Sequence, residues 1–147
     1  MDRRLMEKQT LMISVYSSIK DAMGEINEMT LFTEATYRRD AKKAYLMYNE
    51  SEVSGMEGTK TLLTLESDRV SIRRYSENSS LLKIELGKWN ENIYNTPYGT
   101  FLIKTNGEHI TWDDKDLLRI DLLYSLEVEG EGSVPSEVTI KIEQKRG

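Results

Sequence analysis

The sequence predicts an all-β protein, an antiparallel up-and-down meander that closes into a barrel of about 8–10 strands. Apolar residues alternate with polar ones along most of the chain, and turn residues interrupt this alternation at short intervals. No segment carries a convincing helical stripe longer than two turns. Because sequential hairpins that close on themselves leave no exposed sheet edge, we expect a barrel, with a sandwich as the second possible architecture.

The first part of the chain is predicted to form six strands separated by polar or glycine-containing turns. Apolar residues such as Leu11 and Ile13 alternate with polar ones, so one face of each strand is apolar. Gly24 favours a turn before the second strand, and Gly55 and Gly58 favour a hairpin between the third and the fourth, since glycine tolerates the backbone angles of tight turns. The six predicted strands cover residues 11–20, 28–37, 43–50, 59–66, 69–75 and 82–86.

The second part of the chain shows the same alternation and two turn motifs. Residues 88–95 form either a short strand or a covering loop, and a proline turn follows at residues 96–99. Asn106-Gly107 is typical of a two-residue type I′ hairpin, because both of its central positions need positive φ. We therefore expect this pair to join two separate strands. The predicted strands of this part cover residues 100–105, 108–113, 118–128 and 138–142.

Composition excludes several classes of function. The 147 residues suffice for one domain, which we expect at residues 11–147 after an N-terminal arm of residues 1–10. With no cysteine and a single histidine, His109, disulfides, thiolate nucleophiles and multi-histidine metal sites are excluded within one chain. We expect no cofactor and no metal. The net charge of −5 argues against a nucleic-acid partner, which usually requires a basic face.

The expected location is cytoplasmic, without a membrane partner. Every apolar run is far shorter than the roughly 18 residues of a membrane-spanning segment. The first ten residues are charged and lack the apolar core of a signal peptide.

Arg74 is the most unusual residue of any predicted strand. By strand parity it shares a face with the apolar Val70 and Ile72. A buried arginine without a partner is very costly. Either the strand ends here and Arg74 extends into solvent at the rim, or Arg74 forms an ion pair, for which Glu50 is a candidate, or binds a ligand.

Three motifs resemble those of the bacterial YwiB-like proteins. They are Y-x-x-Y-x-E-S-E-x-x-G-M-E-G-T-K-T at residues 45–61, V-x-I-x-R at residues 70–74 and Y-N-T-P-Y-G at residues 94–99. The resemblance covers nearly the whole chain after the first ten residues. It implies a calycin-like, lipocalin-type β-barrel and supplies no activity. This chain departs from the family pattern at Ala35, where glycine is usual, and after Arg74, where the family usually turns with a glycine.

Small-molecule binding is the first of three functions compatible with such a barrel. A barrel of about eight strands can hold one small ligand, in a cavity with apolar lining and a few placed polar groups. The residues expected to converge on the lumen or its mouth are Tyr45, Tyr48, Glu50, Arg74, Tyr94 and Tyr98.

The other two functions need no ligand cavity. A filled barrel could serve as a protein-interaction or homo-oligomerisation module, through the outward-facing Met12, Tyr16, Phe32 and Met47. An enzyme could use a carboxylate pair, such as Glu50 with Glu52 or Glu57. Because glutamates at a hairpin tip are more often solvated, we expect no enzymatic activity and no catalytic residue.

Overall fold

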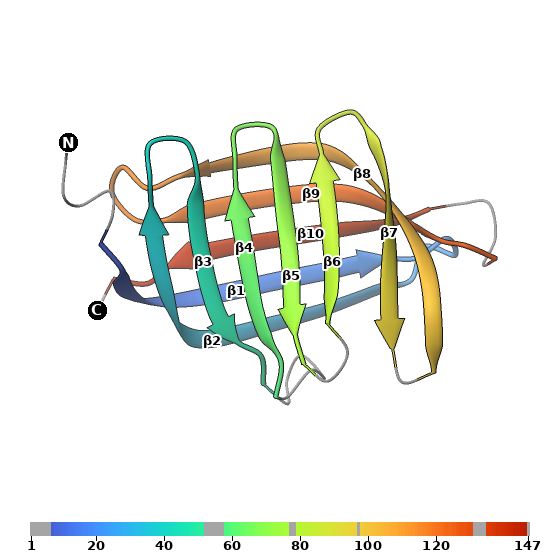
Figure 1. Ribbon diagram of the computed structural model, residues 1–147, viewed down its shortest axis with the longest axis horizontal. Coiled ribbons are helices and arrows are strands. Elements are labelled where there is room, and N and C mark those ends of the chain that lie inside the picture. The colour runs from blue at the N-terminus through green and yellow to red at the C-terminus, as the bar shows by residue number, and fades with distance from the viewer. Residues whose placement is uncertain (1–6, 52–57, 77–78, 97, 131–134, 147) are drawn as a thin grey trace.

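The alternation of apolar and polar residues produces a closed barrel of antiparallel strands (Figure 1). The computed structural model describes residues 7–51, 58–76, 79–96, 98–130 and 135–146. These residues form ten strands and no helix, each strand pairs with the next in the chain, and the first pairs with the last. The predicted fold class is therefore confirmed. The strands are β1 (Gln9–Lys20), β2 (Ile26–Arg39), β3 (Ala44–Asn49), β4 (Lys60–Leu65), β5 (Arg69–Tyr75), β6 (Ser80–Glu85), β7 (Trp89–Thr96), β8 (Gly99–Asp113), β9 (Arg119–Val128) and β10 (Ser136–Gln144).

The barrel consists of two layers whose strands run across each other (Figure 1). The strands from β3 to β7 stand upright in the front layer, while β8, β9, β10 and β1 run behind them. The longest strands, β2 with 14 residues and β8 with 15, curve from one layer into the other. The inner faces of the two layers pack against each other, as in other barrel-like sandwiches with crossed sheets.

Inward side chains of the front layer lie in lateral rows set by the strand register. Two of these rows are buried and wholly apolar, and they belong to the same apolar cluster as Ile120 and Ile142 of the back layer. This part of the interior is therefore filled by side chains. The two rows consist of Leu46, Leu63, Ile72 and Leu82, and of Ala44, Leu65, Val70 and Ile84.

The predicted hairpin at Asn106-Gly107 is wrong, because both residues lie inside the continuous strand β8. The backbone of β6 ends against Gly107: Gly87 donates its N–H to the Gly107 carbonyl at 2.8 Å, and a Cβ on Gly107 would lie 2.7 Å from the Glu85 carbonyl oxygen. The pairing of β8 with β9 also shifts between Gly107 and His109. Position 107 therefore requires a glycine, because another backbone segment approaches it closely at a strand irregularity.

Residues 88–95, predicted to be either a strand or a loop, form most of β7, which pairs with β8 along its whole length. The edge of β7 that faces β6 has almost no backbone ladder. In the described residues, β6 and β7 share one registered pair, Ser80 with Tyr94. Beyond it, Asn92 Oδ1 accepts the Lys83 N–H at 2.8 Å, and the Thr105 hydroxyl donates to the Lys83 carbonyl at 2.6 Å. Buried side chains from β7 and β8 therefore replace the backbone ladder at this seam, where β6 meets β7.

One end of the barrel is closed by polar contacts between β8 and the hairpins of the front layer. Asp114, just after β8, accepts hydrogen bonds from the Tyr37 hydroxyl at 2.7 Å and from Arg39 at 2.6 Å. The Trp112 indole donates to the Glu66 carbonyl at 3.0 Å, and Arg39 lies over the Trp112 ring. A pocket of about 440 Å³ beside these contacts is open to solvent and lies outside the apolar core.

Candidate functional site

Five inward-facing polar and tyrosine side chains lie in one row at the other end of the front layer. The strand register places these five inward-facing residues side by side, each from a successive strand between β3 and β7. The next row towards the middle of the barrel is the apolar one that begins with Leu46. We call this set the polar row; it consists of Tyr48, Thr61, Arg74, Ser80 and Tyr94.

Glu50 and Tyr124 complete the site, which we call the polar cluster together with the polar row. Glu50 follows the end of β3 and is buried, and the Thr61 hydroxyl donates to its Oε1 at 2.8 Å. Tyr124 comes from β9 in the back layer and is buried as well. Its pKa responds to the charge of Arg74 and to Tyr94, so side chains of both layers meet here.

The two buried tyrosines stay protonated at neutral pH. Burial raises the pKa of Tyr48 above its ordinary range, the charge of Glu50 raises it further, and the charge of Arg74 opposes both. Burial raises the pKa of Tyr124 to about 12, again against the opposing effect of Arg74. Both phenols are therefore neutral groups that can donate one hydrogen bond and accept others.

Within the described part of the chain, Arg74 has neither an ion-pair partner nor a hydrogen-bond partner for its Nε. The residue is half-buried, its Nε is enclosed, and this Nε has no hydrogen-bond partner among the described residues. None of the ion pairs within the described part of the chain involves Arg74. Arg74 and Glu50 both act on Tyr48, but they form no direct ion pair with each other. Of the alternatives for Arg74, the direct ion pair with Glu50 is not formed, and the residue lies half-buried one position before the end of β5.

Four of the six predicted site residues lie in the polar cluster, namely Tyr48, Glu50, Arg74 and Tyr94. Tyr45 lies on the outer face of β3, where Arg38 covers its ring at 4.8 Å. Tyr98 lies in the turn before β8 and is 94% exposed. The structure therefore does not bring Tyr45 and Tyr98 to the lumen.

Three members of the cluster were not predicted. Thr61, Ser80 and Tyr124 share strand parity with inward apolar neighbours. The sequence feature that could have identified them is therefore a polar side chain at a position that strand parity places inside the barrel. Tyr45 could have been rejected by the same criterion, because residues three apart on a strand face opposite sides. Gly55, Met56, Glu52 and Glu57 of the predicted hairpin lie outside the described residues.

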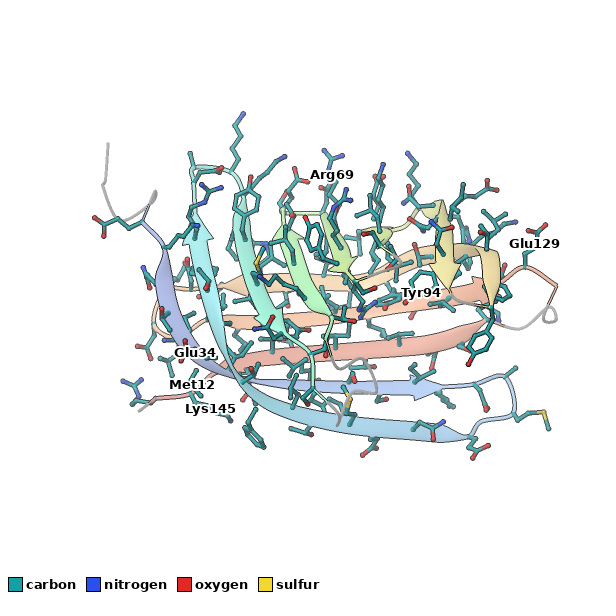
Figure 2. All side chains as sticks on the ribbon, turned by 60° about the horizontal axis from the view of Figure 1, so that its bottom comes forward. Met12, Glu34, Arg69, Tyr94, Glu129 and Lys145 are labelled. Carbon is teal, nitrogen blue, oxygen red and sulfur yellow. The ribbon has the colours of Figure 1, made fainter. Side chains whose placement is uncertain are left out.

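The residues of the cluster differ in burial. Tyr48, Glu50, Thr61 and Tyr124 are buried, whereas Arg74 and Tyr94 are only partly buried. Figure 2 shows Tyr94 between the two layers. Its partner across the strands, Phe101, is 39% exposed. The partly exposed side of the cluster therefore lies towards β7 and β8.

Other kinds of site find less support in the described part of the chain. No group of three or more His, Cys, Asp and Glu residues there is arranged to hold a metal ion. His109 is exposed on β8 beside Thr111. Those same residues include no helix with the length and apolar character needed to cross a membrane.

Comparison with known proteins identifies a family without a known activity. Residues 13–142 match the family described as "Domain of unknown function (DUF1934)". The fold is similar to the crystal structure of the ywiB protein from Bacillus subtilis, with a TM-score of 0.75 at 20% sequence identity, over 97% of this chain and 96% of that one. No curated protein matches the chain. The resemblance to YwiB-like proteins is thus confirmed, and the chain belongs to the DUF1934 family.

Proposed function

We propose that this protein binds a small molecule at the polar cluster and catalyses no reaction. The observation that carries the proposal is the enclosed Nε of Arg74, which has no hydrogen-bond partner among the described residues. A buried polar atom without a partner costs roughly 1–3 kcal/mol, and more for a charged group. A ligand oxygen that accepts this hydrogen bond would remove the cost.

The binding site is proposed for the end of the barrel rather than its middle. The apolar rows above the polar row are filled by leucine, isoleucine and valine side chains, which leaves no space for a central ligand among them. At the polar row the neutral phenols of Tyr48 and Tyr124 and the charged groups of Glu50 and Arg74 converge. A few placed polar groups beside apolar walls are typical of small-molecule sites.

The filled-barrel alternative draws support from the outer face. Phe32 is 68% exposed and Met12 50% exposed, whereas Tyr16 and Met47 are half-buried. An interaction module does not, however, need an arginine inside the barrel that forms no ion pair with any described residue. For this reason we favour ligand binding. Cytoplasmic location stays a prediction, which fractionation of the host cell would test.

Native mass spectrometry of protein purified from its own host tests the proposal. We expect the wild type to carry a low-mass molecule that Arg74→Met loses. Arg73→Met is the matched control, because Arg73 precedes Arg74 on β5, is exposed and lies over the outer Tyr75 ring. A wild-type protein without a retained molecule, or equal retention in both variants, would contradict the proposed function.

A further inference from the structure

We propose that the ligand is a small zwitterion, with a cationic nitrogen that binds Glu50 and a carboxylate that binds Arg74. The inference rests on the proposed function and adds the chemical class of the ligand. Its basis is that the polar cluster contains two opposite charges, Glu50 and Arg74, which form no direct ion pair with each other.

The charge balance of the cluster favours this class. Glu50 is buried, Arg74 is half-buried, and they form no direct ion pair, although both act on the pKa of Tyr48. Charges inside a protein are tolerated when they are paired and hydrogen-bonded. A zwitterion placed between the two supplies one partner to each and leaves the total charge of the site unchanged.

The hydrogen-bonding capacity of both side chains fits such a ligand. An ionised carboxylate accepts about four hydrogen bonds; the Thr61 hydroxyl donates to Oε1 of Glu50, and the Tyr48 hydroxyl also interacts with this carboxylate. An ammonium group could use the remaining capacity. The enclosed Nε of Arg74, which has no hydrogen-bond partner among the described residues, belongs to an edge of the guanidinium fork, and an edge of this kind binds a carboxylate through two parallel hydrogen bonds once a ligand oxygen reaches it.

Ligands of other charge fit less well. Arg74 is the one cationic side chain of the polar cluster as defined, so a phosphate monoester would bring two negative charges beside Glu50 and face one positive charge. A neutral sugar would leave both charges without an ionic partner. A simple carboxylic acid would satisfy Arg74 and place a second negative charge beside Glu50.

The partly exposed side of the cluster indicates which part of the ligand would lie outward. Tyr94 and its cross-strand partner Phe101 border this side, and both keep some exposed surface. An apolar or aromatic substituent of the ligand would lie against these rings. An α-amino acid with an apolar side chain combines this substituent with the two charges, and we use L-phenylalanine and L-leucine as probes.

Isothermal titration of the purified protein with matched compounds tests the inference. For each probe the amino acid is compared with its amide, which lacks the carboxylate, and with its deaminated acid, which lacks the ammonium group. We expect the amino acid to bind at least about tenfold tighter than either analogue, a ratio that corresponds to about 1.4 kcal/mol.

Two variants assign each charge to its partner. Arg74→Met should abolish the preference for the amino acid over its amide, and Glu50→Gln should abolish its preference over the deaminated acid. Circular dichroism and urea unfolding show whether each variant is folded. If a variant does not fold, the comparison of compounds on the wild type still tests the inference.

The outcomes separate this inference from the proposed function. Equal or tighter binding of a singly charged analogue would overturn the zwitterion and leave small-molecule binding intact. The same conclusion would follow if neither series bound while native mass spectrometry detected an Arg74-dependent molecule of another charge class. If neither series bound and no molecule were retained, both proposals would fail.

Discussion

Replacement of Asn92 by alanine tests how the barrel closes between β6 and β7. Asn92 is 5% exposed, and its Oδ1 accepts the Lys83 N–H at 2.8 Å in a region where the two strands share one registered backbone pair. The Asn92 amide group also makes three contacts at 3.4 Å, which are too long to contribute much.

The magnitude follows mainly from the single short hydrogen bond. Loss of the acceptor leaves the Lys83 N–H without a partner, which costs about 1–3 kcal/mol. We therefore expect the free energy of unfolding of Asn92→Ala to fall by about 2 kcal/mol. For a chain of this size that corresponds to a decrease in Tm of about 4–8 °C.

Urea unfolding and amide hydrogen exchange measure this effect. Asn95→Ala is the matched control, because Asn95 lies on the same strand and its Oδ1 accepts an exposed hydrogen bond from Thr100; we expect a change within about 0.5 kcal/mol. Exchange at the Lys83 amide should accelerate in Asn92→Ala and stay unchanged in Asn95→Ala.

A second substitution at the seam measures its cooperativity. Thr105→Val removes the 2.6 Å hydrogen bond to the Lys83 carbonyl with little change in volume. Because Asn92 accepts the N–H of Lys83 and Thr105 donates to the carbonyl of the same residue, the double variant should differ from the sum of the single variants by about 0.5 kcal/mol or more. If Asn92→Ala and Asn95→Ala had equal stability and equal Lys83 exchange, side chains would not be what closes the barrel there.

Three further predictions concern the interior and the outer face. Gly107→Ala is expected to lower the free energy of unfolding by about 1–3 kcal/mol, because the new Cβ would lie 2.7 Å from the Glu85 carbonyl oxygen; wild-type stability in urea would contradict this close approach. Burial raises the pKa of Tyr124 from 10.0 to about 12, so the neutral phenol contributes stability fully below pH 10 and loses this contribution as pH rises from 10 to 12. Tyr124→Phe should therefore reduce the fall in the free energy of unfolding between pH 10 and pH 12. If urea unfolding at several pH values showed the same fall in the wild type and the variant, burial would not raise the pKa of this phenol. Phe32→Ser should leave the molar mass in light scattering unchanged; a shift from dimer to monomer would support the interaction module instead.

The fold could be predicted from the sequence because it depends on local alternation. Val70 and Ile72, for example, alternate with polar residues whatever the neighbouring strands are, and the closed meander follows from many such strands in succession. The hairpin predicted at Asn106-Gly107 was wrong because the role of Gly107 depends on a segment that is distant in the sequence. Only the arrival of β6 at Gly107 distinguishes a close backbone approach from a turn.

The candidate site was partly predictable for the same reason. Arg74 stands out by parity alone, and the Tyr48 to Glu50 segment was recognised beside it. Tyr124 was not predicted, because the effect of Arg74 on its pKa depends on how the back layer lies over the front layer. The sequence also could not show that Glu50 and Arg74 form no ion pair, because such a pair depends on side-chain placement and not on strand register.

A crystal structure of the protein purified from its own host, without added ligand, tests the central claim most directly. We predict electron density for a molecule other than protein or solvent, with an oxygen within about 3 Å of Arg74 Nε, the distance of a hydrogen bond. A structure in which a protein group occupies that position, and side chains fill the space between Arg74, Glu50 and Tyr124, would contradict the proposed ligand site.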